Sequence, residues 1–143
     1  MTPIRITRVL LGMLASVTIM SACASQRAQN ETAIRAGASL YQTSCAGCHG
    51  ANATGNGPIT PVIGVQPPDL TRIAARRGGT FPELDVWRII DGQADLSAHG
   101  PRHMPVWGYE FFGDDPDDEV AHRQAEQKVD GLVSYLRSIQ RRD

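Results

Sequence analysis

The stretch Cys45-Ala46-Gly47-Cys48-His49 decides how the rest of the chain is interpreted. Two thiols at this spacing can each add to one vinyl group of a porphyrin, and the histidine that follows can ligate the iron from one face. A redox dithiol needs no adjacent histidine, and half of a zinc site needs a second pair of ligands elsewhere. The chain has no second cysteine pair. The motif therefore predicts covalent attachment of one haem c, with iron, to Cys45, Cys48 and His49.

The first 22 residues have the features of an export signal. Arg5 and Arg8 precede an apolar run over residues 9–20, and small residues follow it. A positive start, a short apolar core and a small-residue end are typical of a secretory signal peptide. The apolar run is shorter than the roughly 20 residues that span a bilayer. Residues 1–22 are therefore predicted to direct export.

The end of this signal resembles a bacterial lipobox. It reads Met20-Ser21-Ala22-Cys23, with methionine where leucine is usual. The resemblance implies that Cys23 becomes the lipidated first residue of the mature chain and anchors it in the bilayer; cleavage nearby by an ordinary signal peptidase is the alternative. Residues 23–30 are then a lipidated tether, expected to be flexible. Either way, the protein is expected on the periplasmic side of a bacterial membrane.

Cysteine count and charge restrict the remaining possibilities. The chain has three cysteines, of which one is assigned to lipid and two to haem, so no structural disulfide is expected. The formal net charge of the whole chain is −1, and it becomes −3 when Arg5 and Arg8 leave with the signal. A mildly acidic domain of this kind is not expected to bind nucleic acid.

Two amphipathic helices are predicted at the ends of the mature chain. In the first, apolar residues recur at helical spacing from residue 33 to the motif, with Asn30 or Thr32 as a possible cap. Gly37 in mid-helix suggests that another backbone passes close to it. The apolar stripe of the second helix lies in residues 128–139, and the acidic residues 117–119 lie where this helix would begin. Its apolar stripe comprises Val129, Leu132, Val133, Leu136 and Ile139.

The middle of the chain is expected to be mostly irregular. Glycines and prolines over residues 55–68 predict a loop that covers a haem edge. Residues 69–71 begin a short helical stretch, and residues 83–91 have helical spacing that Gly92 ends. Residues 95–108 are predicted to be loop, and the acidic residues 110–119 a solvated surface loop.

Met104 is the candidate for the second axial ligand of the iron. It is the only methionine after the signal, it lies 55 residues after His49, and Pro105 stiffens the backbone beside it. His99 and His103 flank it and could compete for the iron, join Met104 in a copper site, or be exposed loop residues. The prediction is a haem iron ligated by His49 and Met104.

Several further motifs together resemble the class I, single-haem cytochromes c. The resemblance covers roughly residues 34–139 and implies an all-α fold for a haem-binding domain of residues 31–143, in which the N-terminal and C-terminal helices cross. It also implies that the Pro58 carbonyl accepts a hydrogen bond from the His49 ring. Its motifs are Cys45-Ala46-Gly47-Cys48-His49-Gly50, Gly57-Pro58, Pro67-Pro68-Asp69-Leu70-Thr71, Met104-Pro105-Val106-Trp107-Gly108 and Leu132-Val133-Ser134-Tyr135-Leu136.

An iron with both axial positions filled can pass electrons but offers no site to a substrate. The sequence therefore predicts a non-enzymatic, single-electron carrier, a monomer or complex subunit whose partners are redox proteins such as a respiratory complex, oxidase or reductase. Docking is expected to be weak and to be steered by Arg72, Arg76 and Arg77 or by acidic residues 114–118. The alternatives are a haem-based sensor or peroxidase with a labile Met104, and a fixed subunit of one larger complex.

Overall fold

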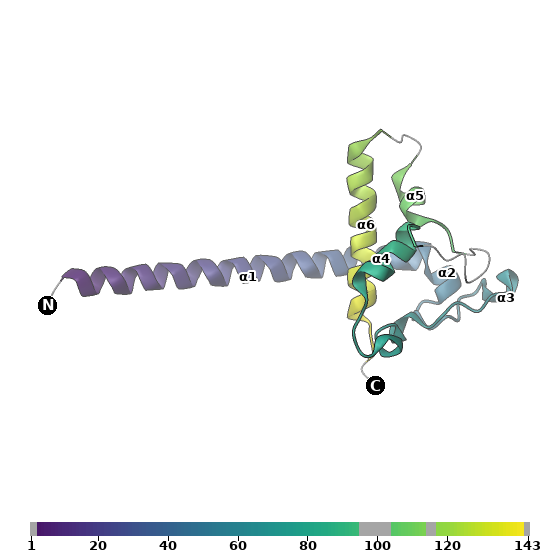
Figure 1. Cartoon of the computed structure of the whole chain (residues 1–143), viewed down its shortest axis with the longest axis horizontal. Helices are drawn as coiled ribbons and strands as arrows, with labels where there is room; N and C mark the ends of the chain where they lie inside the picture. The colour runs from purple at the N-terminus through teal and green to yellow at the C-terminus, as the bar shows by residue number, and fades with distance from the viewer. Residues whose placement is uncertain (1–2, 95–103, 114–116, 142–143) are drawn as a thin grey trace. The chain divides into compact units, whose positions relative to one another are not determined.

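A computed structural model describes residues 3–94, 104–113 and 117–141, and it describes side chains from Ala24 onward. These residues form helices joined by turns and loops, without a strand among them (Figure 1). The all-α prediction is confirmed. The helices are α1 (Pro3–Ser44), α2 (Ala46–His49), α3 (Thr60–Ile63), α4 (Glu83–Asp91), α5 (Trp107–Phe112) and α6 (Glu119–Ser138), and the short 3-10 turns are η1 (Leu70–Arg72) and η2 (Ala75–Arg77).

The chain divides into two compact units, residues 1–32 and 33–143. Helix α1 continues without a break through residues 24–30, which were expected to be a flexible tether. Asn30 and Thr32, the expected caps of a new helix, lie inside α1. The physical reason is the absence of a stop signal, since no glycine or proline interrupts residues 14–36. Thr32 Oγ1 donates to the Ala28 carbonyl at 2.8 Å, as a mid-helix threonine does. Within the described part of the chain, no helix is long and apolar enough to cross a membrane.

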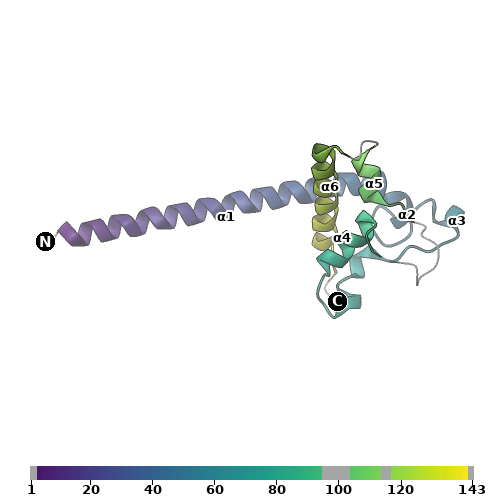
Figure 2. The same ribbon diagram turned by 45° about the horizontal axis from the view of Figure 1, so that its top comes forward.

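The second unit is built on the crossing of α1 with α6 (Figure 2). Gly37 makes this crossing possible, because a Cβ atom there would overlap the carbonyl group of Gly131. Tyr41 and Tyr135 pack beside the crossing with ring centroids 5.3 Å apart. The close approach predicted at Gly37 is confirmed. The core around the crossing consists of Tyr41, Ala53, Val86, Ile90, Val129, Leu132, Val133 and Leu136.

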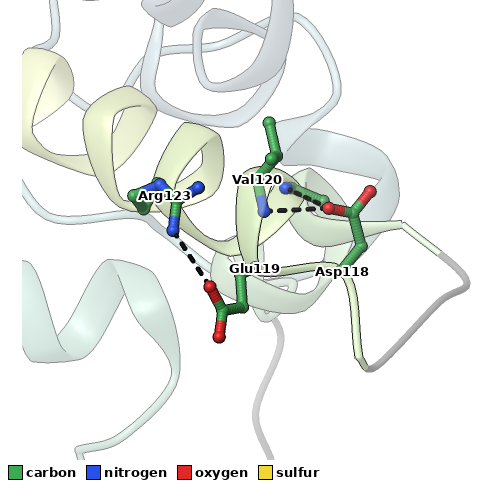
Figure 3. Close-up of polar contacts among 5 residues, drawn as sticks. Asp118, Glu119, Val120 and Arg123 are labelled. Atoms are coloured by element: carbon green, nitrogen blue, oxygen red, sulfur yellow. Dashed lines mark hydrogen bonds and ion pairs between the residues drawn. The ribbon is translucent and has the colours of Figure 1, made fainter.

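The N-terminus of α6 is capped by an acidic side chain. Asp118 accepts hydrogen bonds from the backbone nitrogens of Val120 at 2.8 Å and Ala121 at 3.0 Å (Figure 3). A cap of this kind is worth about 1 kcal/mol. Glu119 and Arg123 form an exposed ion pair at 3.5 Å one turn further on, which adds little because water screens it. The acidic start predicted for this helix is confirmed.

Helix α4 has the predicted bounds and ends at Gly92, whose φ of 97° is the left-handed conformation that favours glycine. Trp87 Nε1 donates to Asp130 Oδ1 at 2.9 Å, which fastens α4 to α6. Helix α5 was not predicted, because its residues were expected to belong to two loops. Trp107 and Phe111 stack at 5.4 Å from successive turns, and this i, i+4 aromatic pair is the signal that could have identified the helix.

Candidate haem-attachment site

The Cys45–His49 motif lies where α1 gives way to α2. Cys45 N donates to the Tyr41 carbonyl at 2.9 Å, and His49 N donates to the Cys45 carbonyl at 2.9 Å. The helical turn brings Cys45 and Cys48 to one side, as residues three apart on a helix are. Both cysteines are half-buried free thiols. The turn therefore presents two thiols and an imidazole together.

The Cys45 thiol is poorly suited to redox chemistry of its own. Burial, and to a smaller extent the neighbouring Cys48, raise its pKa to about 11. A thiol with such a pKa is protonated at neutral pH, whereas redox-active dithiols depend on a thiolate of lowered pKa. The electrostatics of the site therefore disfavour the dithiol alternative.

His49 has the protonation state that a metal ligand requires. Burial lowers the pKa of its imidazole, and the Pro68 backbone opposes this effect only in part. A neutral ring has a free lone pair for a metal ion. Among the described residues, His49 Nδ1 is the one buried side-chain nitrogen or oxygen without a hydrogen-bond partner of good geometry. An orphaned nitrogen of this kind indicates a ring whose intended partners include a bound group.

The proline expected to contact the His49 ring was Pro58, and this expectation stays a prediction, although the backbone of Pro68 is the one that raises the pKa of the ring. The residues on either side of Pro58 contact the motif directly, since Gly57 N donates to the Cys48 carbonyl and Ile59 N to the Gly47 carbonyl, both at 3.1 Å. Pro58 and Pro68 are both exposed.

The loop after the motif folds back onto it through a chain of hydrogen bonds. The buried Tyr41 hydroxyl donates to the Gly50 carbonyl at 2.7 Å, and burial raises the pKa of this phenol. Gly55 N donates to the His49 carbonyl at 2.8 Å. Sequence analysis expected no regular structure here, but residues 60–63 form one helical turn, α3, which includes Pro61 in its first turn. These contacts hold the motif in a single backbone conformation.

The chain just after Pro68 is held in place by Gln140, which follows the end of α6. Gln140 Nε2 donates to the carbonyls of Leu70 at 2.8 Å and Leu136 at 2.7 Å, and its Oε1 accepts from Ala74 N at 2.9 Å. Gln140 was not identified as important from the sequence, because a polar residue at a helix end has no distinctive pattern. It links the end of α6 to the segment next to His49.

Met104 packs against the same core as Cys45, although the two are far apart in the sequence. It is half-buried and lies just before α5. The motif and the thioether predicted as a ligand therefore border the same hydrophobic core. His99 and His103 lie outside the described residues.

These residues fit a covalently bound haem. Two free thiols are available to bond the porphyrin, and a neutral, half-buried imidazole and a thioether are available to its iron, all without formal charge. The described residues contain no group of three or more His, Cys, Asp or Glu side chains that could hold a metal ion. The zinc alternative for Cys45 and Cys48 thus lacks further ligands within that part of the chain.

Comparison with known proteins agrees with this fit. The family model described as Cytochrome c matches residues 34–140. The chain belongs to the cytochrome c family. No curated protein and no solved structure matches it. Membership implies one covalently bound haem c with its iron, and haem-based electron transfer with redox proteins as partners. Cytochromes c are generally electron carriers rather than enzymes.

Proposed function

We propose that this cytochrome c is a single-electron carrier in which Cys45 and Cys48 hold the haem and His49 and Met104 ligate its iron. The observation that supports the proposal most directly is the half-buried, neutral His49 ring, whose buried Nδ1 makes no hydrogen bond, next to two free thiols. The packing of Met104 on the core shared with Cys45 supports its assignment as the second ligand. Bound haem c supplies an iron that alternates between the ferrous and ferric states.

The protein residues tune and shield this centre. The Met104 thioether favours the reduced iron relative to a second histidine. Hydrogen bonds from residues 55, 57, 59 and 60 to the motif keep its backbone fixed, so that little reorganisation accompanies oxidation. With both axial positions filled, substrates have no open coordination site. These properties suit transfer of one electron at a time between redox proteins.

The optical spectrum of the oxidised holoprotein tests the ligand assignment. We expect the weak far-red band that reports sulfur ligation to low-spin ferric haem, and we expect Met104→Ala to lose it. Met104→His should stay low-spin but lack the band, whereas Val106→Ala, in the same loop, should keep it. A low-spin wild-type protein without the band would contradict Met104 ligation. A high-spin wild-type protein would instead favour a sensor or peroxidase.

We further propose that the carrier is exported and anchored through lipid on Cys23, on the periplasmic side of a bacterial membrane. The support is the signal-like residues 1–22 and the lipobox-like residues 20–23. A lipid tether would raise the local concentration of the carrier near membrane-bound partners. Whether it serves as a mobile shuttle or as a subunit of one complex depends on those partners.

Labelled palmitate supplied to bacteria that express the full chain tests the anchor. The wild-type protein should incorporate the label and sediment with membranes, and Cys23→Ala should do neither. Ser25→Ala, two residues away, is the matched control and should behave like the wild type. Incorporation of label into Cys23→Ala, or none into the wild type, would contradict lipidation at this residue.

A further inference from the structure

Met104, the proposed second ligand of the iron, is joined to helix α5 by a short link. Pro105 and Val106 separate it from Trp107, the first residue of α5. The ring of Pro105 fixes one of the backbone angles in this link. So short a link absorbs little movement, and a displacement of α5 is therefore passed on to the Met104 thioether. The contacts that hold α5 thus help to place the thioether.

Helix α5 begins against the end of α4. A Cβ atom on the buried Gly108 would overlap the carboxylate and the carbonyl group of Asp91, the last residue of α4. The hydrogen bond from Trp87 to Asp130 fastens α4 in turn to α6. The beginning of α5 is therefore closely seated. A helix of six residues has little stability of its own, so its end depends on further contacts.

The end of α5 is held by Lys128, an exposed residue of α6. Its Nζ donates to the Phe111 carbonyl at 3.4 Å and lies 5.4 Å from the centroid of the Phe111 ring. The carbonyl groups at the end of a helix have no donor within the helix, and they carry partial negative charge that attracts a cation. An aromatic ring attracts a cation at this distance as well. One ammonium group thus contacts both the backbone and the side chain of Phe111.

Phe111 connects the Lys128 contact to Met104. Its ring stacks on Trp107, and Met104, Trp107 and Phe111 all pack against the same hydrophobic core. A second contact joins the same two helices, because Phe112 stacks on His122 with ring centroids 3.6 Å apart. Loss of the Lys128 contact should therefore loosen α5 without releasing it from α6.

We propose that Lys128 is a positioning residue for Met104, which it keeps available to the iron by holding the end of α5 on α6. The proposal rests on the proposed ligation of the iron by His49 and Met104. A neutral thioether is a weak ligand, so its occupancy depends on how firmly the protein holds it. Lys128 therefore acts on the haem site through Phe111 and α5, although it is an exposed charge on the far side of that helix from the ligand.

Displacement of Met104 by imidazole in the oxidised holoprotein tests the proposal. At saturating imidazole the rate of displacement equals the rate at which the thioether leaves the iron, and the loss of the far-red sulfur band records it. Lys128→Met keeps an unbranched side chain but removes the charge, and it should make displacement about tenfold faster. Lys128→Arg retains a cation that can donate to a carbonyl and lie over a ring, and it should keep a rate close to that of the wild type.

Arg123→Met is the matched control. It removes one positive charge from the same helix, at an exposed residue whose ion pair is with Glu119. Its displacement rate should be close to that of the wild type. Equal acceleration in Arg123→Met and Lys128→Met, or none in Lys128→Met, would overturn the positioning role. The same conclusion would follow if Lys128→Arg lost Met104 as fast as Lys128→Met.

Amide hydrogen exchange separates positioning from a general loss of stability and requires no reaction at the haem. Glu110 N, which donates to the Val106 carbonyl at 3.0 Å, should exchange about tenfold faster in Lys128→Met. Leu132 N, at the buried crossing of α1 and α6, should keep its wild-type rate. Equal acceleration at both amides would overturn the positioning role alone. A wild-type holoprotein without the sulfur band would overturn the proposed function itself, and this inference with it.

Discussion

Replacement of Gly37 by alanine should destabilise the haem-binding unit by about 3 kcal/mol. A Cβ atom at this position would overlap the carbonyl group of Gly131 and lie 2.9 Å from Leu132 N. All of these neighbours are backbone atoms of α6, so no side-chain rotation can relieve the overlap. Helices α1 and α6 would have to move apart.

The cost of that movement falls on the core at the crossing. Tyr41 and Val129 are fully buried and Leu132 is 1% exposed, so separation of the helices would admit water to their surfaces. Each buried side chain of this size contributes roughly 1.5–3 kcal/mol. Alanine ordinarily stabilises a helix relative to glycine by about 1 kcal/mol, and the steric effect should exceed this gain.

Denaturant unfolding of the holoprotein measures this effect, with Gly131→Ala as the control. A Cβ atom on Gly131 would lie 3.4 Å from both Ala33 O and Gly37 N, at the edge of ordinary contact. We expect this second variant to be neutral or slightly stabilised. Two glycines that face each other should thus respond in opposite ways. Similar unfolding free energies for the two variants would contradict the tight crossing.

The close approach of α6 to Gly37 illustrates which features could be predicted from the sequence. A glycine inside a helical pattern costs stability, so its presence indicated a close neighbour before the neighbour was known. Helix α4 was predicted with correct bounds because Gly92 and the periodicity of residues 83–91 are local signals. Both predictions needed only residues near one another in the chain, whereas the identity of Gly131 as the neighbour came from the structure.

Features that depend on distant residues were predicted less well. Pro58 and Pro68 each lie in a proline-containing loop motif, and no local pattern distinguishes which one contacts the His49 ring. The hydrogen bonds that hold Gly57 and Ile59 against the motif also join residues with no shared local pattern. The role of Gln140 likewise depends on partners that are up to 70 residues away in the chain. Such pairings arise from the tertiary fold.

Gly57→Ala should damage the haem-attachment site itself. A Cβ atom on Gly57 would overlap the carbonyl groups of Gly47 and Cys48. Relief of the overlap requires the loop to move away from the motif, which would break the hydrogen bonds from Gly57 N and Thr60 Oγ1 to the Cys48 carbonyl. We expect a loss of about 3 kcal/mol in unfolding free energy and a lower yield of protein with covalently attached haem.

Gly47→Ala is the matched control for this prediction, although Gly47 lies between the two cysteines. Its Cβ atom would meet only the Ile59 side chain, at 3.6 Å from Cδ1, which is ordinary van der Waals contact. Haem content per polypeptide, measured by absorbance after denaturation, should therefore fall for Gly57→Ala and stay near the wild-type value for Gly47→Ala. If Gly47→Ala lost as much haem as Gly57→Ala, the motif itself would be intolerant of any added atom. The contact between the loop and the Cys48 carbonyl would then not be what shapes the site.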